Sequence, residues 1–309
     1  MKLSRRFVLA GTAALAAAGA LPFGARRVWA VTSLTAGELR IDSLSDGHLE
    51  LPPETAFAAI PEAERAALLD ALSIDATAPV HSPLNVTLMR QGDRVVLFDV
   101  GSGPDFVPTA GKLADALQAV GVAPEDVTDV IFTHGHPDHL WGLLDEFDEP
   151  LFPNAALRMG AAEFDYWTDP ATAMTIAETW QSFAAGAIRR LSPVADRVER
   201  FADGDEVVPG VRAVMTSGHT PGHMSFALGT PDTGIFVTGD FVTSLIGFAR
   251  PDLGTGTDSD PALAAETRKA MLARLAGEGW TILGYHLPGG GIGRVERDGD
   301  AFRFVEKTE

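Results

Sequence analysis

The chain has 309 residues, of which 46% are hydrophobic and 21% charged, as expected of a globular protein with one large core or two modest ones. Its formal net charge of −18 argues against a nuclease or nucleic-acid-binding protein, because an acidic surface repels phosphate backbones. Cysteine is absent, which excludes disulfides, a cysteine nucleophile and thiolate metal sites. Any metal ion must therefore be held by imidazole and carboxylate groups.

The first thirty residues are typical of an export signal. Basic residues precede an apolar stretch over 7–21 that is too short to span a bilayer comfortably. The segment 4–9, Ser-Arg-Arg-Phe-Val-Leu, resembles a twin-arginine signal, and Ala30 closes a small-residue cleavage site. We expect residues 1–30 to be a cleaved signal peptide and the mature protein to be periplasmic or secreted, without a membrane anchor. An uncleaved N-terminal anchor is the alternative.

The rest of the chain, 31–309, is expected to form one domain with a lead-in at 31–80, a core at 80–290 and a C-terminal hairpin. The clearest element of the lead-in is a helix at Glu62–Leu72, which begins after Pro61. Further helices are predicted at 112–120, 161–167, 171–187 and 261–276. Strands are predicted at 85–90, 94–99, 129–133, 198–201, 211–216, 224–228, 235–238 and 281–284, with the hairpin at 293–305. Strands in hairpins as well as between helices favour an α+β fold with mixed sheets covered by helices.

Three imidazoles and a carboxylate follow the strand predicted at 129–133. His134 and His136 are two residues apart, so in an extended segment they point the same way and can converge on one ion. Gly135 between them permits an unusual backbone conformation. A helix beginning near Asp138 turns that carboxylate and His139 towards a second position. Such nitrogen and oxygen donors suit zinc or a similar divalent ion, and their density disfavours the alternative of a surface loop.

The stretch 133–139, Thr-His-Gly-His-Pro-Asp-His, resembles the signature of the metallo-β-lactamase superfamily. Later elements of that family occur in order, at 217–223, 238–240 and 284–286. The resemblance covers about 80–290 and implies an αββα sandwich of two mixed sheets flanked by helices. It also implies two divalent ions, most simply Zn²⁺, with manganese, cobalt or iron as alternatives.

The resemblance further implies which residues bind the two ions. One ion is held by His134, His136 and His219. The other is held by Asp138, His139 and His286, and Asp240 bridges both. His223 is expected to pack or to orient a ligand, and Asp99 to accept hydrogen bonds that orient the loop. His48 and His81 belong to no motif and are expected to be structural.

Within the superfamily the chain is most similar to the methyl parathion hydrolase group, which includes aryl-ester and lactone hydrolases. The stretches 99–109, 164–167, 258–269 and 286–293 carry this resemblance. It implies that Phe106, Trp167 and Phe183 line an aromatic pocket for the leaving group. Plain core packing of these rings is the alternative.

The function implied is that of an exported dinuclear metal-dependent hydrolase of phosphotriesters, aryl esters or lactones. A hydroxide bridging the metals would attack the ester, with Asp240 orienting it and Asp138 in the same catalytic set. The partner is then a small-molecule ester rather than a nucleic acid, and a homodimer is expected from the resemblance. An acyl-homoserine lactonase remains an alternative, as does a non-catalytic metal-binding protein. A β-lactamase is disfavoured by Asp240, and a glyoxalase II-like thioesterase by the short C-terminal hairpin.

Overall fold

A computed structural model describes residues 31–36, 39–230 and 234–307. The predicted signal peptide, 1–30, lies outside the described residues. Among the helices that are described, none is both long and apolar enough to cross a membrane.

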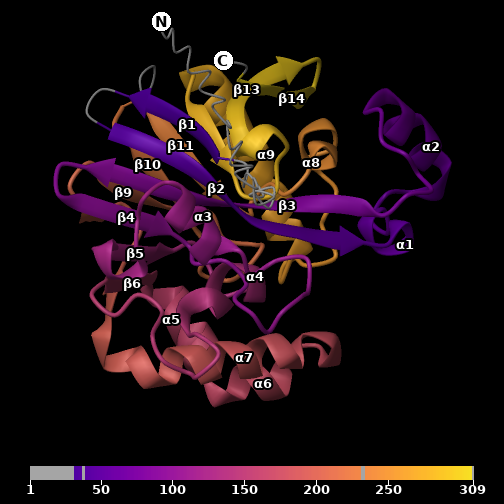
Figure 1. Cartoon of the computed structure of the whole chain (residues 1–309). Coiled ribbons are helices and arrows are strands. Elements are labelled where there is room, and N and C mark those ends of the chain that lie inside the picture. The colour runs from indigo at the N-terminus through magenta and orange to yellow at the C-terminus, as the bar shows by residue number, and fades with distance from the viewer. Residues whose placement is uncertain (1–30, 37–38, 231–233, 308–309) are drawn as a thin grey trace, which may run out of the picture.

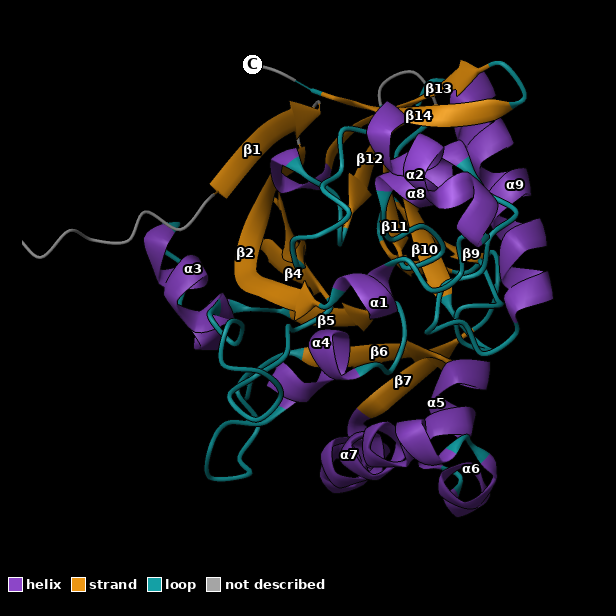
Figure 2. Cartoon of the chain, turned by 90° about the vertical axis from the view of Figure 1, so that its right-hand side faces the viewer, coloured by secondary structure: helices purple, strands orange, loops and turns teal. Residues whose placement is uncertain are grey.

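Two seven-stranded sheets form the centre of the molecule, and helices cover their outer faces (Figures 1 and 2). The first sheet has the order β1-β2-β3-β4-β5-β6-β7. Its strands are β1 (Val31–Ala36), β2 (Leu39–Leu51), β3 (Val80–Gln91), β4 (Arg94–Phe98), β5 (Asp129–Phe132), β6 (Ala156–Gly160) and β7 (Val198–Phe201). β1 to β4 pair antiparallel and β4 to β7 pair parallel, so the sheet is mixed, as predicted.

The second sheet has the order β14-β13-β12-β11-β10-β9-β8. Its strands are β8 (Glu206–Val208), β9 (Val211–Met215), β10 (Met224–Leu228), β11 (Ile235–Gly239), β12 (Thr281–Gly284), β13 (Ile292–Asp298) and β14 (Ala301–Glu306). The β11–β12 pair is parallel and the other described pairs are antiparallel. The predicted C-terminal hairpin is confirmed as β13–β14.

The helices lie outside this pair of sheets, with α3 and α9 on opposite sides of the molecule (Figure 2). They are α1 (Pro53–Ala56), α2 (Glu62–Ala71), α3 (Leu113–Ala119), α4 (Pro137–Leu140), α5 (Ala161–Thr168), α6 (Pro170–Thr175), α7 (Gln181–Leu191), α8 (Leu245–Ala249) and α9 (Pro261–Glu278). This arrangement is the αββα sandwich that the sequence predicted.

The first sheet is buried on both faces because its side chains alternate between two cores. Val96 and Phe98 of β4 pack between the sheets with Phe226 and Val237 of the second sheet. Leu97 between them points to the other face, where it joins the core beneath α3. Burial on both faces holds rigid the strand ends that carry the polar loops.

The predicted helix at 171–187 is wrong, because the chain forms α6, a single 3-10 turn at Glu178–Trp180, and then α7. Ile176 and Ala177 are extended, with ψ angles of 151° and 143°. α7 packs back against α6 and α4, so tertiary packing overrides a helical pattern that would otherwise continue.

The lead-in contains two strands that were not predicted, β1 and β2. β2 is hidden in the sequence because its register shifts between Ser45 and Gly47, which breaks the alternation of side chains. At this point the buried Asp46 carboxylate accepts hydrogen bonds from the backbone N–H groups of Ser102, Lys112 and Leu113. The lead-in is therefore an integral part of the first sheet.

Candidate metal centre

The seven predicted ligands lie in segments that follow strands of both sheets. β5 ends at Phe132 and α4 begins at Pro137, so the segment 134–139 passes from strand into helix as predicted. His219 lies between β9 and β10, Asp240 directly follows β11, and His286 lies two residues after β12. The ends of these strands bring together side chains that are up to 152 positions apart in the chain, from His134 to His286.

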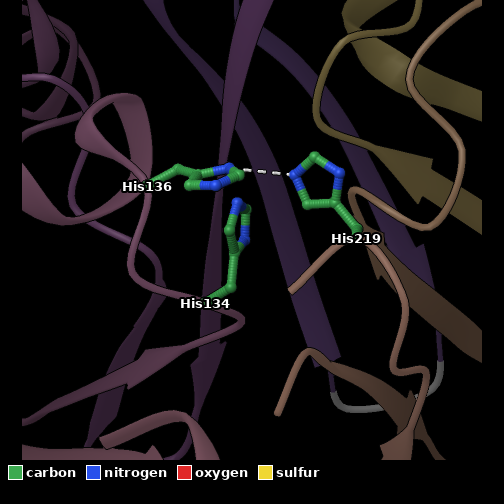
Figure 3. Close-up of side chains that lie close together, drawn as sticks. All are labelled: His134, His136 and His219. Carbon is green, nitrogen blue, oxygen red and sulfur yellow. Dashed lines mark hydrogen bonds between the residues drawn. The ribbon is translucent and has the colours of Figure 1, made fainter. Parts of the chain in front are cut away.

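His134, His136 and His219 form a first triad, with one ring nitrogen from each within 4.8 Å of the others. His136 Nδ1 lies 3.0 Å from His219 Nε2. Figure 3 shows the three rings turned towards one another, with His219 approaching from the opposite side to His136. All three residues are buried.

Asp138, His139 and His286 form a second triad with the same spacing limit of 4.8 Å. Asp240 lies between the two triads, because His134, His139 and Asp240 also meet within that limit. Its Oδ2 is 3.1 Å from His286 Nε2, and its Oδ1 is 3.4 Å from His139 Nε2.

Three polar atoms at the centre of this arrangement have no hydrogen-bond partner in the described part of the chain. They are His134 Nε2, His139 Nε2 and Asp240 Oδ1, all buried. An unpaired buried polar atom costs about 1–3 kcal/mol, so three in one place indicate a group that satisfies them together. Imidazole nitrogens and carboxylate oxygens are the donors that zinc and related divalent ions accept. The residues therefore fit divalent metal ions.

A second layer of hydrogen bonds fixes the imidazole rings. Asp99 Oδ2 lies 2.8 Å from His139 Nδ1, and Asp99 also accepts the Thr133 N–H and hydroxyl, each at 2.8 Å. The prediction that Asp99 orients the loop is confirmed. Asp258 Oδ1 lies 3.0 Å from His219 Nδ1, although the sequence had suggested no such role for it. These contacts occupy one ring nitrogen and leave Nε2 of His139 and His219 facing the centre.

His223 is placed as a support for Asp240. Its Nε2 accepts the Asp240 N–H at 2.8 Å, and its Nδ1 lies 2.8 Å from the Thr216 hydroxyl. Both ring nitrogens are therefore occupied, and His223 belongs to none of the ligand groups. Burial, with the neighbouring His219, lowers the pKa of His223 to about 3. The expectation that His223 packs and orients is confirmed.

Glu163 of α5 was not singled out by the sequence. Its buried carboxylate accepts four hydrogen bonds from the two ligand loops and from Trp167. Oε1 accepts the N–H of Gly135 at 3.0 Å and the indole N–H of Trp167 at 2.6 Å. Oε2 accepts the Thr220 hydroxyl at 2.8 Å and the Gly222 N–H at 2.9 Å. Its only sequence signal is a glutamate four residues before a tryptophan on an otherwise apolar helix face.

Gly135 is required for close packing rather than for an unusual backbone angle. It is not among the described glycines with positive φ, which corrects the expectation from the sequence. A Cβ at this position would lie 2.4 Å from Cδ1 of Trp167, well inside van der Waals contact. Any larger residue would therefore push the loop that carries His134 and His136 away from α5.

The protonation states of the first triad favour metal binding. Burial, together with neighbouring histidines, holds the pKa of His134 and of His136 well below the usual value, so both rings are neutral ligands at pH 7. In the second triad burial would lower the pKa of His286, but the carboxylates of Asp240 and Asp138 outweigh it and raise that pKa to about 10. Metal binding at His286 therefore releases a proton.

The three predicted pocket residues lie near the first triad but in different settings. Phe183 of α7 is half-buried, with its ring centroid 5.8 Å from that of His136 and 5.9 Å from that of Phe106. Trp167 is 1% exposed and packs beneath Gly135. Trp180, which the sequence analysis missed, is half-buried and stacks on His136 with centroids 6.2 Å apart. Phe183, Phe106 and Trp180 therefore form the accessible part of this aromatic group.

The chain matches the family model described as metallo-beta-lactamase superfamily over residues 81–286. An N-acyl homoserine lactonase from Bacillus sp is 28% identical over 159 residues, which cover 51% of this chain and 55% of that protein. Mouse metallo-beta-lactamase domain-containing protein 1 is 45% identical over 71 residues, covering 21% of this chain and 25% of the mouse protein. These matches thus span from about a quarter to about half of the length of the relatives.

Two solved structures match over nearly their whole length. Hydrolase AbOPH of the beta lactamase superfamily has a TM-score of 0.84 and 28% identity, covering 92% of this chain and 99% of that one. AidC, a dizinc quorum-quenching lactonase, also has a TM-score of 0.84, with 22% identity over 91% of this chain and 98% of its own, and supports the fold. The fold, the groups of metal-ligand side chains and the family model all agree. The chain therefore belongs to the metallo-beta-lactamase superfamily of metallo-hydrolases.

Proposed function

We propose that this protein hydrolyses ester bonds with two divalent metal ions. His134, His136 and His219 would hold one ion and Asp138, His139 and His286 the other, with Asp240 placed between the two groups. The observation that carries this proposal is the meeting of three buried atoms that have no hydrogen-bond partner among the described residues, namely His134 Nε2, His139 Nε2 and Asp240 Oδ1. Zinc is the metal we expect, since every donor is an imidazole or a carboxylate.

When bound, the two ions supply Lewis acidity and activate water at neutral pH. The chain's own residues hold and orient the reactants. The Asp240 carboxylate lies between the two triads, with Oδ2 3.1 Å from His286 Nε2 and Oδ1 3.4 Å from His139 Nε2, where it would orient the attacking water. The backbone N–H of Asp240 is held by His223, which fixes the carboxylate in place. Asp138 is held in turn, because its carbonyl oxygen accepts the Tyr285 hydroxyl at 2.6 Å.

The substrates we propose are phosphotriesters, aryl esters or lactones. The half-buried rings of Phe106, Trp180 and Phe183 beside His136 suit an aromatic or otherwise apolar leaving group. The similarity to hydrolase AbOPH supports a hydrolytic reaction without indicating the substrate. N-acyl homoserine lactones are the second candidate, supported by the 28% identical lactonase from Bacillus sp.

The test compares kcat/KM of the zinc-loaded protein on an aryl phosphotriester and on an aryl lactone. We expect measurable turnover of at least one, lost after chelation and in the His134→Ala and Asp240→Ala variants. A lactone preference of a hundredfold or more, about 2.7 kcal/mol in barrier, assigns a lactonase. Near-normal turnover with stoichiometric metal in either variant refutes the ligand set.

We also propose that residues 1–30 direct export and that the mature enzyme acts outside the cytoplasm on a small-molecule ester, as a homodimer. The twin-arginine-like sequence at 4–9 supports export of the folded chain. Fractionation of cells, followed by N-terminal sequencing, tests this. A cytoplasmic protein that retains residues 1–30 refutes it.

A further inference from the structure

A second group of metal-ligand side chains lies outside the centre described above. It consists of His48 and Glu50 on β2 and His81 on β3. Glu50 and His81 are paired across the two antiparallel strands, and His48 is two residues from Glu50 on the same face of β2. The paired ends of β2 and β3 project beyond the rest of the first sheet towards α1 (Figure 1). Strand register therefore brings the three side chains together.

The three ligand atoms lie at distances that suit a shared ion better than hydrogen bonds. His48 Nε2 is 3.6 Å from Glu50 Oε1, and His81 Nε2 is 3.9 Å from the same oxygen. Both distances exceed the usual 2.7–3.2 Å of a hydrogen bond. Ligands about 2.0–2.2 Å from a tetrahedral zinc ion are roughly 3.4 Å apart, so a small closure completes the geometry. Besides this closure one imidazole ring must turn, because the rings are stacked, with centroids 4.8 Å apart and planes 23° apart, and each nitrogen binds an ion in the plane of its ring.

Hydrogen bonds hold the backbone of His48 in place, so binding an ion requires movement of the side chains alone. His48 exchanges two hydrogen bonds with Thr109, because its N–H donates to the Thr109 carbonyl and its carbonyl accepts the Thr109 hydroxyl. The side chains of His48, Glu50 and His81 are 35%, 55% and 63% exposed, so an ion can reach them from solvent. The net charge of −18 favours cations in the vicinity of the protein.

We propose that His48, Glu50 and His81 form an additional, solvent-accessible site for a divalent transition-metal ion such as Zn²⁺. Three protein ligands leave the fourth position to water or to a small anionic ligand. The site lies next to the buried centre, because Ser82 and Pro83 follow His81 and contact His286 Nδ1 at 3.1 and 3.0 Å. An ion in the additional site holds together the strand ends that orient His286.

The experiment counts zinc by equilibrium dialysis of the full chain, expressed without a histidine tag, followed by elemental analysis. Wild type is compared with His48→Ala/His81→Ala and with Glu50→Gln, at a free Zn²⁺ concentration that saturates wild type. We expect the double variant to hold one ion fewer per chain and Glu50→Gln to bind that ion more weakly. This difference does not depend on how many ions the buried centre holds, so it is separate from the test of the proposed function.

Glu54→Gln is the matched control, because Glu54 is exposed and close in sequence but belongs to no ligand group. It should keep the wild-type zinc content. A zinc-soaked crystal should show an anomalous peak between His48, Glu50 and His81. Equal zinc contents in wild type and the double variant overturn the proposal. So does loss of the same ion in Glu54→Gln, which would indicate diffuse binding by surface charge. Circular dichroism of each variant confirms that the fold is retained.

Discussion

Single residues outside the ligand set hold the geometry of the metal centre. Glu163 connects the loop of His134 and His136, through Gly135, to the loop of His219, through Thr220 and Gly222. Because the first loop follows a strand of the first sheet and the second belongs to the other sheet, one carboxylate aligns ligands contributed by both. Its side chain is fully buried, so no water replaces these contacts if it is changed.

Replacing Glu163 with Gln should lower the free energy of unfolding of the metal-free protein by about 2–4 kcal/mol. The amide NH₂ group of the glutamine would face N–H and O–H donors that now donate to the carboxylate, and about two of these donors would lose their acceptor. Urea denaturation measures this loss, and zinc affinity should fall in parallel. Glu178→Gln is the control, because Glu178 is exposed on the turn before α7. An unchanged urea midpoint and zinc affinity in Glu163→Gln would show that the carboxylate aligns nothing.

His223 should make stability depend on pH between about 6.5 and 3. Its pKa is about 3 in the folded state and 6.5 as an unperturbed group. Between these values His223 is therefore protonated in the unfolded chain and neutral in the folded chain. The contribution of neutral His223 to the free energy of unfolding is fully present above this pH range and is lost as the pH falls through it. His223→Gln keeps an acceptor for the Asp240 N–H but cannot be protonated.

Between pH 7 and pH 5 the free energy of unfolding of His223→Gln should therefore fall by about 2 kcal/mol less than that of wild type. Urea titrations of both metal-free proteins at several pH values measure the difference. Between pH 7 and 8 the free energies of unfolding of the two proteins should change with pH at nearly the same slope, which provides an internal control. Parallel slopes down to pH 5 would contradict the buried neutral state of His223.

At the scale of elements, α7 and the turn before it carry the rings that we expect to bind substrate. Trp180 and Phe183 pack against each other, with centroids 4.8 Å apart, and both approach His136. The break at Ile176 and Ala177 allows this, because a continuous helix over 171–187 would carry Trp180 away from the ligand loop. The segment that sequence periodicity predicted wrongly is thus the one that shapes the surroundings of the metal centre.

Trp180→Ala and Phe183→Ala should each raise KM for aryl substrates about tenfold while kcat changes little, since a partly buried ring contributes about 1.5 kcal/mol to binding. Steady-state kinetics on an aryl ester and on an aliphatic ester of equal reactivity measure the effect. Met174→Ala on α6, where the side chain is 75% exposed, should leave both substrates unaffected. Equal changes for the two esters would show that the rings do not contact the aryl group.

The sequence predicted the elements and side chains that obey local rules. The strand before His134, the helix after Asp260 and the terminal hairpin follow from apolar periodicity, capping and turn residues. The meeting of the seven ligand-type residues was predictable because their motifs belong to a known family. β2, Glu163 and Trp180 were not predictable, since their roles depend on a bulge, on hydrogen bonds between loops and on a helix break that only tertiary packing determines.

At the scale of the whole molecule, metal ions at the centre would link the two sheets. The segment 134–139 extends from the first sheet, whereas His219, Asp240 and His286 extend from the second. Unfolding separates these ligands, so bound ions stabilise the folded state according to their concentration and affinity.

Removing metal with a chelator should lower the melting temperature by about 5–10 °C, since an ion at a hundred times its dissociation constant contributes about 2.7 kcal/mol. Differential scanning calorimetry before and after chelation, with restoration by Zn²⁺, measures the shift. His134→Ala should show a smaller shift on chelation than wild type, because it lacks one ligand of the first triad. A wild-type melting temperature that chelation does not change would mean that the ions do not link the sheets.

The chain order of the ligand loops also bears on biosynthesis. Translation delivers the segment 134–139 first, while His286 emerges only after 285 residues have been made. An unfinished polypeptide that stops before β12 lacks the third member of the second triad and the strands β12, β13 and β14 of the second sheet. Metal acquisition is thus a late event in the making of this protein. A prematurely terminated product, with an incomplete second sheet and an incomplete centre, becomes a target for proteolysis rather than a weakened enzyme.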